Sequence, residues 1–241
     1  MKHYQQRGFT FKQFHVAHEG CAMKVGTDGI LLGGWTRLQQ PERILDIGCG
    51  SGLIALMLAQ RTQHMPIAID AIDIDADAVT QSRQNVTHSP WAERIHIYHQ
   101  DLVDFNQGHY SHLVSNPPYF PHGQVFEDPR RAIARQTYTL SHQQLLIQAA
   151  RLARSDATLS LILPYAEGEQ LLMISQSSGW YLRRRCEVVT KIKSIQPQRL
   201  LLEFSRCSGD CESQQLSIYQ QPGVYSQTFK RLYRDFYLNL D

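Results

Sequence analysis

The fold of this 241-residue chain is decided by the stretch RILDIGCGSGLIALMLAQR, residues 43–61. Its first five residues are mostly apolar, as in a buried strand, and its last nine carry leucines at helical spacing. Between them, DIGCGSG (46–52) holds three glycines, which allow a sharp turn and a close approach of the backbone to a ligand. A strand, a glycine loop and a helix in this order predict one βα unit of a parallel sheet.

The alternation of short apolar runs and amphipathic stretches continues along the chain. Further strands are expected at 67–74, 94–99, 112–115 and 158–164, further helices at 75–86, 141–154 and 167–178, and two closing antiparallel strands at 180–189 and 199–205. Asp75 and Ser141 are expected to cap two of the helices, because their side-chain oxygens accept from free helical N–H groups. This spacing predicts an α/β fold with a doubly wound, mostly parallel sheet.

Size and composition narrow the class of protein. The chain is long enough for one domain with short extensions, and 42% hydrophobic with 19% charged residues is ordinary for a globular protein. The five scattered cysteines favour a reduced protein over a disulfide framework, and nothing in their spacing indicates a metal site. No apolar run has the length of a signal peptide or a membrane span. We therefore expect a cytoplasmic protein without a metal.

The net charge of +2 is unevenly distributed. Residues 130–206 carry 12 basic and 5 acidic side chains, a surplus of seven. Such a basic segment favours the phosphates of a nucleic acid, although a solvated surface with spare charge explains it equally well.

The glycine loop has acidic neighbours that indicate its ligand. Asp73 ends the second strand, where a carboxylate can accept both hydrogen bonds of a ribose diol. The loop reads GxGxG after an acid, whereas pyrophosphate sites use GxGxxG. It resembles the first motif of class I S-adenosylmethionine-dependent methyltransferases, whose cofactor carries an ammonium that Asp46 would suit. The resemblance implies that the cofactor is bound by Asp46, Gly48, Gly50, Gly52, Asp73 and Asp101, the last near the adenine amine. The alternative is that the three glycines serve only the turn and that Asp101 is an exposed aspartate in another turn.

The segment SNPPYF (115–120) follows the fourth strand. Proline cannot continue a sheet or a helix, so two prolines hold the backbone rigid there. Asn116-Pro117-Pro118-Tyr119 resembles the signature of methyltransferases that act on amino groups. The resemblance implies that the Asn116 side chain and the Pro117 carbonyl accept from an NH2 group, that Asn116 also touches the cofactor, and that Tyr119 stacks on the substrate. Two prolines that merely end a strand would explain neither the asparagine nor the tyrosine.

This chemistry depends on alignment more than on a base. The lone pair of an adenine amine is delocalised, and two acceptors on its hydrogens favour a more pyramidal nitrogen. The methyl on a sulfonium is already activated, so transfer is aided chiefly by positioning and fixed dipoles. We assign no metal and no general base, and His112 and His122 are neighbours without a role.

The N-terminal stretch FTFKQFHVAHEGCAMKVGTDGILLGGW (9–35) narrows the family. It resembles the leader of bacterial tRNA adenine-37 N6-methyltransferases that modify a valine tRNA, and the likeness continues through most of the chain to RDFYLNL (234–240). It departs after 120 and over 180–215. The resemblance implies a Rossmann-like seven-stranded sheet with one antiparallel strand near the C-terminal end. It also implies an extension (1–40) packed on the cofactor site of a methyltransferase domain (41–241), and a monomer.

The same resemblance implies contacts of the leader and a substrate. Lys24, Gly26, Thr27 and Asp28 would contact the methionine end of the cofactor, unless Asp28 only caps the following helix. Phe9, Phe11 and Phe14 either stack on bases or belong to the core. The substrate would be the anticodon stem-loop of a tRNA. The charge count, and not the resemblance, suggests that its phosphates are held by Arg130, Arg131, Arg135, Arg151, Arg154, Arg183, Arg184 and Arg185. A glutamine N5-methyltransferase of a release factor, a DNA or ribosomal RNA adenine methyltransferase and a catalytically silent RNA-binding module remain alternatives.

Overall fold

The computed structural model describes residues 7–19, 21, 24–39, 41–118, 141–191 and 196–240. The predictions for Tyr119, His122, Arg130, Arg131 and Arg135 lie outside these residues. In the described part of the chain, no helix is long and apolar enough to cross a membrane. The same residues contain no group of three or more His, Cys, Asp and Glu side chains that could hold a metal ion.

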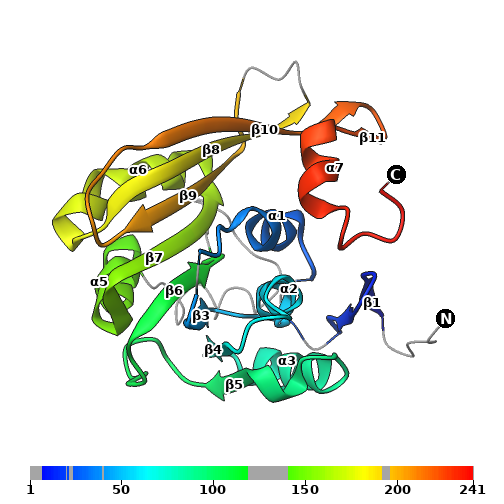
Figure 1. The fold of residues 1–241 in the computed structure, drawn as a ribbon, viewed down its shortest axis with the longest axis horizontal. Coiled ribbons are helices and arrows are strands. Elements are labelled where there is room, and N and C mark those ends of the chain that lie inside the picture. Colours follow the sequence, from blue (N-terminus) through cyan, green and yellow to red (C-terminus); the bar gives the residue numbers. More distant parts are fainter. Residues whose placement is uncertain are drawn as a thin grey trace, which may run out of the picture.

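A nine-stranded sheet forms the centre of the protein (Figure 1). Its order is β11-β10-β8-β9-β7-β6-β3-β4-β5. The strands are β3 (Arg43–Ile47), β4 (Ala68–Asp73), β5 (Ile95–His99), β6 (Tyr110–Ser115), β7 (Ala153–Pro164), β8 (Tyr181–Lys191), β9 (Arg199–Ser205), β10 (Glu212–Gln221) and β11 (Val224–Tyr225). The seven strands from β5 to β8 confirm the predicted sheet, in which β9 runs antiparallel to both neighbours. β10 and β11 extend it beyond the prediction.

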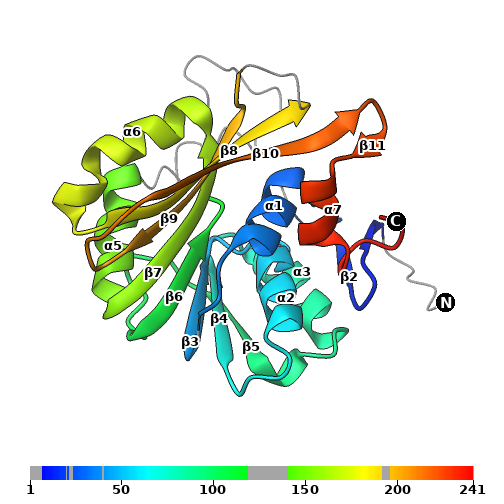
Figure 2. The ribbon, with the colours of Figure 1, turned by 45° about the horizontal axis from the view of Figure 1, so that its top comes forward.

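Helices cover both faces of this sheet (Figure 2). They are α1 (Thr27–Trp35), α2 (Leu53–Arg61), α3 (Ala76–Thr87), α5 (His142–Leu152), α6 (Tyr165–Ser175) and α7 (Gln227–Tyr233), with short 3-10 turns η1 (Ala92–Arg94) and η2 (Gln176–Ser178). α5 and α6 lie on one face, and α1, α2, α3 and α7 on the other. The doubly wound arrangement is therefore confirmed.

The helix starts follow their capping residues. Asp75 caps α3 by accepting from the backbone N–H groups of Asp77 and Ala78. Ser141 caps α5 in a capping box with Gln144, which satisfies two free donors at once. Both predicted caps are confirmed. The alternative prediction that Asp28 caps α1 is wrong, because Gly26 occupies the N-cap position and Asp28 lies inside the first turn of the helix.

The leader packs on the face that carries α1 and α2. It forms a separate two-stranded sheet of β1 (Gly8–Thr10) and β2 (His15–Ala17). Phe11 and Phe14 are each 2% exposed and belong to the main core, which excludes them as platforms for bases. Burying a phenylalanine contributes about 1.5–3 kcal/mol, so the leader is fixed largely by hydrophobic packing.

Candidate functional site

The predicted site residues meet at one edge of the sheet. β3, β4 and β6 are parallel neighbours, so their carboxyl ends lie side by side. The glycine loop (48–52) follows β3, Asp73 ends β4 and Asn116 follows β6. The Ser115 hydroxyl donates to the Ile47 carbonyl at 2.8 Å, which ties the strand before Asn116 to the strand before the loop. The three predicted motifs are thus brought together by the order of the strands.

The glycines of the loop adopt backbone angles that other residues rarely reach. Gly48, Gly50 and Gly52 have φ of +70°, +53° and +78°. A Cβ added at Gly48 or Gly50 would meet no atom within 4 Å, so these two glycines border open space. The conformation requires glycine, and it leaves the loop surface free for a ligand.

The Asp73 carboxylate is hydrogen-bonded to the backbone of the glycine loop. Its Oδ2 accepts from the Gly50 N–H at 2.7 Å, and its Oδ1 accepts from the Asp75 N–H at 2.9 Å. Burial raises the pKa of Asp73 above its usual value, while these backbone donors lower it. A carboxylate has about four lone-pair sites, so these two hydrogen bonds leave acceptor capacity for a ribose hydroxyl. The side chain therefore fits the role that the sequence suggests.

Asp46 is fully buried beneath the loop. Its Oδ2 accepts from the Ala55 N–H at 3.1 Å, and its Oδ1 has no hydrogen-bond partner among the described residues. Burial raises the pKa of Asp46 to about 7, the Ala55 N–H lowers it, and the nearby Asp73 raises it further. A buried acceptor without a donor is unfavourable, and a cationic ligand at the loop would favour the ionised form.

The leader reaches the same edge through α3. The Asn85 side chain on α3 accepts from the Ala17 N–H at 3.0 Å, and donates to the Ala17 carbonyl at 2.8 Å and to the Ser51 carbonyl of the glycine loop at 2.9 Å. No local pattern in the sequence marks Asn85, because its partners lie 68 and 34 residues away. Sequence reasoning therefore missed it.

A cavity of 330 Å³ lies along the leader. Arg7, His18, Glu19, Cys21 and Lys24 line it. Burial raises the pKa of Cys21 to about 12, with further increases from the carboxylates of Asp73, Asp75 and Asp77. Cys21 therefore lies close to the carboxyl end of β4 as a neutral thiol.

The remaining predicted cofactor contacts lie near this edge. Thr27 and Asp28 form the first turn of α1, directly after Gly26. The Asp28 carboxylate accepts from Arg199 Nε at 2.8 Å, and Arg199 begins β9 opposite the end of β7. Asp101 follows β5, and its side chain accepts from the Val103 N–H at 2.9 Å. That bond is the turn interaction considered as the alternative, so its contact with adenine stays a prediction.

The basic segment is more neutral than its charge count indicates. Arg184 is 8% exposed, donates to Glu203 at 2.8 Å and lies over the ring of Trp35. Arg185 forms ion pairs with Glu169 and Glu187. Arg183 forms no ion pair within 4 Å among the described residues, although its charge contributes to lowering the pKa of Glu212. The prediction that Arg184 contacts phosphates is therefore wrong, because its guanidinium is buried and paired with Glu203.

Arg151 and Arg154 are also committed to the protein itself. Arg151 donates to three carbonyls of the turn between β5 and β6. Arg154 pairs with Glu42 and Asp156. Neither arrangement leaves a guanidinium without protein partners.

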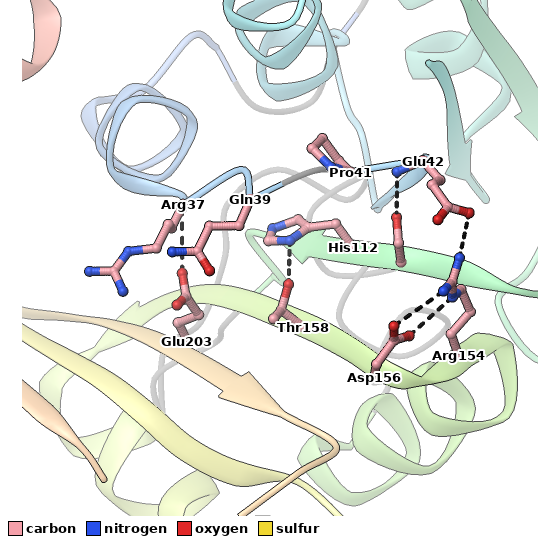
Figure 3. Close-up of a pocket in the computed structure, with 10 residues that line it drawn as sticks. Arg37, Gln39, Pro41, Glu42, His112, Arg154, Asp156, Thr158 and Glu203 are labelled. Atoms are coloured by element: carbon pink, nitrogen blue, oxygen red, sulfur yellow. Dashed lines mark hydrogen bonds and ion pairs between the residues drawn. The ribbon is translucent and has the colours of Figure 1, made fainter. Parts of the chain in front are cut away.

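A second cavity of 250 Å³ opens at the opposite, amino edge of the sheet (Figure 3). Its arginines, Arg37 and Arg154, are paired with acidic side chains. His112 lines it, with Nδ1 hydrogen-bonded to the Thr158 hydroxyl. Burial, with a smaller effect of Arg61, lowers the pKa of His112 to about 3, so it stays neutral. This cavity lies at the opposite edge from the glycine loop, so His112 is not placed as a general base for a reaction at the loop.

Known proteins resemble the chain in sequence and in fold. The family described as Methyltransferase small domain matches residues 29–158. A tRNA1(Val) (adenine(37)-N6)-methyltransferase of Tolumonas auensis is 47% identical over 96% of this chain and 97% of its own length. A protein of the same name from Yersinia enterocolitica is 46% identical over 96% and 93%.

Solved structures share the fold at low sequence identity. A predicted O-methyltransferase from Agrobacterium tumefaciens matches with a TM-score of 0.67 at 15% identity, over 87% of this chain and 96% of that chain. A methyltransferase from Pyrococcus furiosus matches with a TM-score of 0.53 at 16% identity, over 78% and 90%.

Proposed function

Because the chain belongs to the tRNA1(Val) (adenine(37)-N6)-methyltransferase family, we propose that it methylates N6 of adenine 37 in a valine tRNA. The methyl donor is S-adenosylmethionine. One observation carries the proposal: the glycine loop, the buried Asp46 and the Asn116 segment lie together at the carboxyl edge of the sheet. That edge is where ligands bind in doubly wound folds.

The residues at the loop fit the proposed cofactor. Gly48 and Gly50 border open space, and Asp73 keeps acceptor capacity for a ribose hydroxyl. The unpartnered Oδ1 of Asp46 suits the ammonium of a methionine moiety. S-adenosylmethionine supplies a methyl group that is activated on a sulfonium. Lys24, Gly26, Thr27 and Asp28 are proposed to close its methionine end, consistent with the position of the first turn of α1.

The protein's own contribution is to orient the amine. The Asn116 side-chain oxygen and the Pro117 carbonyl would each accept one hydrogen of the exocyclic NH2, which favours a pyramidal nitrogen. The backbone there is held by the prolines and by the bond from Ser115 to Ile47. Catalysis then rests on positioning and on fixed dipoles. The neutral His112 does not take the proton, which we propose leaves to solvent after transfer.

A tRNA anticodon loop suits such a site. An adenine in a single-stranded loop is extruded more cheaply than one in a duplex, where unpairing costs a few kcal/mol. Among the predicted phosphate contacts that the structure describes, Arg183 has only a long hydrogen bond to the Cys207 carbonyl, and we propose it as a phosphate contact. A tRNA substrate also implies a cytoplasmic enzyme, and the monomeric state stays a prediction.

Methyl transfer from labelled S-adenosylmethionine into tRNA, protein and DNA, measured in parallel, tests the proposal. Labelling of tRNA, with N6-methyladenosine found by mass analysis of its nucleosides, is expected. Labelling of protein would instead favour the glutamine methyltransferase, and labelling of DNA the DNA enzyme. Labelling of none of the three, with RNA still bound, would favour the silent RNA-binding module.

A matched pair of variants tests the role of Asn116. Asn116→Ala should abolish transfer and leave cofactor affinity largely intact. The control is Asn106→Ala, at an exposed asparagine near the amino edge of the sheet. Full activity of Asn116→Ala would refute the assigned mechanism even if tRNA is the substrate.

A further inference from the structure

Asn85 joins two segments that belong to different parts of the proposed cofactor site. Its amide forms a reciprocal pair of hydrogen bonds with the backbone of Ala17, as a neighbouring strand would, and its second amide hydrogen bonds to Ser51. The side chain is 4% exposed, so water cannot replace these bonds. Only a primary amide provides one acceptor and two donors in this arrangement.

The two partners of Asn85 are the ends of functional segments. Ser51 lies between Gly50 and Gly52 in the glycine loop. Ala17 ends β2, and the leader then continues to Cys21. The carboxylate of Asp73 contributes to the raised pKa of the Cys21 thiol. A change in the position of Asn85 therefore moves the loop and the leader together.

A second contact fixes the far end of the same stretch of leader. The ion pair between Asp28 and Arg199 holds the start of α1 to the start of β9 at 2.8 Å. Neither partner is fully exposed. The leader is thus attached at Ala17 on one side of the site and at Asp28 on the other.

We propose that Asn85 is a positioning residue for cofactor binding: its amide holds the leader strand and the glycine loop in one fixed relation. The inference rests on the proposed function, because it concerns the same S-adenosylmethionine site. Asn85 does not touch the reacting atoms. It acts through Ser51 and Ala17, and its loss should weaken cofactor binding more than the methyl-transfer step.

The primary test compares Asn85→Ala with Gln60→Ala. Gln60 is a buried control, because its amide donates to the Asp235 carbonyl and joins α2 to the C-terminal segment, away from the loop. Titration calorimetry with S-adenosylmethionine should show a dissociation constant about tenfold higher for Asn85→Ala, as expected when hydrogen bonds of this kind are lost. Gln60→Ala should retain the wild-type constant at a comparable loss of thermal stability.

The kinetic signature separates positioning from general damage. Asn85→Ala should raise the KM for S-adenosylmethionine about tenfold and keep kcat within about twofold at saturation. Tryptic cleavage within residues 7–24 should become faster in the variant, and added cofactor should slow it less than in the wild type. A lower kcat with an unchanged KM would overturn the proposal.

Asn85→Asp carries the test if the alanine variant does not fold. An ionised carboxylate would face two carbonyl oxygens, whereas the protonated acid can donate to one of them. The ratio of its cofactor affinity to that of the wild type at the same pH should therefore rise as the pH falls from 8 to 5. A constant ratio, or wild-type affinity in both variants, would overturn the inference. A wild-type protein that does not bind the cofactor would refute the proposed function instead.

Discussion

Replacing Asp46 by asparagine should stabilise the protein without its cofactor at neutral and alkaline pH. Burial raises the pKa of Asp46 from 3.8 to about 7 in the folded state. Between these two values the folded protein binds a proton that the unfolded chain has lost, so its stability falls as the pH rises. One pKa unit corresponds to about 1.36 kcal/mol, which gives a loss of about 4 kcal/mol over the whole window. The amide side chain of the Asp46→Asn variant does not ionise, so the variant would escape this loss.

Urea unfolding of the two proteins at pH 5 and pH 8 measures this effect. Most of the titration lies between these values, so the free energy of unfolding of Asp46→Asn relative to wild type should increase by about 2–3 kcal/mol from pH 5 to pH 8. Titrating groups that do not interact with Asp46 cancel in this difference. The amide oxygen of the variant can still accept from the Ala55 N–H, so the local structure is conserved.

Asp77→Asn serves as the control, because this aspartate is exposed in the first turn of α3. Its relative stability should change by less than about 0.5 kcal/mol over the same range. If the Asp46→Asn and wild-type curves ran parallel from pH 5 to pH 8, the buried carboxyl would not carry a raised pKa. The argument for an ammonium at this position would then lose its electrostatic basis. In the same series, S-adenosylmethionine should raise the melting temperature of the wild type far more than that of Asp46→Asn.

Further substitutions have defined outcomes. Gly50→Ala, at φ +53°, should cost roughly 1–2 kcal/mol of stability by urea unfolding, and its methyl group, which would enter the open space at the loop, should weaken cofactor binding in calorimetry. Gly34→Ala would place a Cβ 2.1 Å from Tyr233 Cε1 and should lower stability by about 1–3 kcal/mol in thermal unfolding. Arg184→Gln should destabilise the fold by about 3–5 kcal/mol, because it leaves a buried carboxylate unpaired. Arg183→Gln should keep the melting temperature and reduce the slope of log K for tRNA binding against log salt concentration by about one. A stable Arg184→Gln with a reduced slope, or a destabilised Arg183→Gln with an unchanged slope, would refute the assignment of Arg184 to the interior and of Arg183 to phosphate binding.

Local patterns were sufficient where the signal lies within one short window. The strand at 43–47 and the helix at 53–61 have the predicted bounds, because an apolar run, a glycine loop and spaced leucines specify them without help from the rest of the chain. β10 was missed because ESQQLSIYQQ is mostly polar and buries only Leu216 fully. Pairing with β8 makes it a strand, and that contact is not visible in its own sequence.

The residues of the site likewise fall into those that a short sequence window predicts and those that depend on long-range contacts. Asp46, Asp73 and Asn116 could be predicted because each lies at the end of a strand, and parallel strands end at a common edge. Asn85 could not, since the bonds that join the leader to the glycine loop are long-range. Charge counting failed at Arg184 for a related reason: successive side chains of a strand point to opposite faces, so neighbours in the sequence do not share an environment.

The carboxyl edge of the sheet at the glycine loop contains groups that lower the stability of the protein without its ligand. Asp46 is buried, its Oδ1 has no hydrogen-bond partner in the part of the chain that the structure describes, and burial also raises the pKa of Asp73. Ionisation of both buried carboxyls is unfavourable in the protein alone, and it becomes favourable when a cationic, diol-bearing ligand lies against the loop. Carboxyls whose pKa is raised by burial are typical of binding sites, where the surrounding structure maintains them. The same reasoning requires Asp46→Asn to gain stability and to lose cofactor affinity together. A variant that gained both stability and cofactor affinity would show that the Asp46 carboxylate does not bind the ammonium of the cofactor.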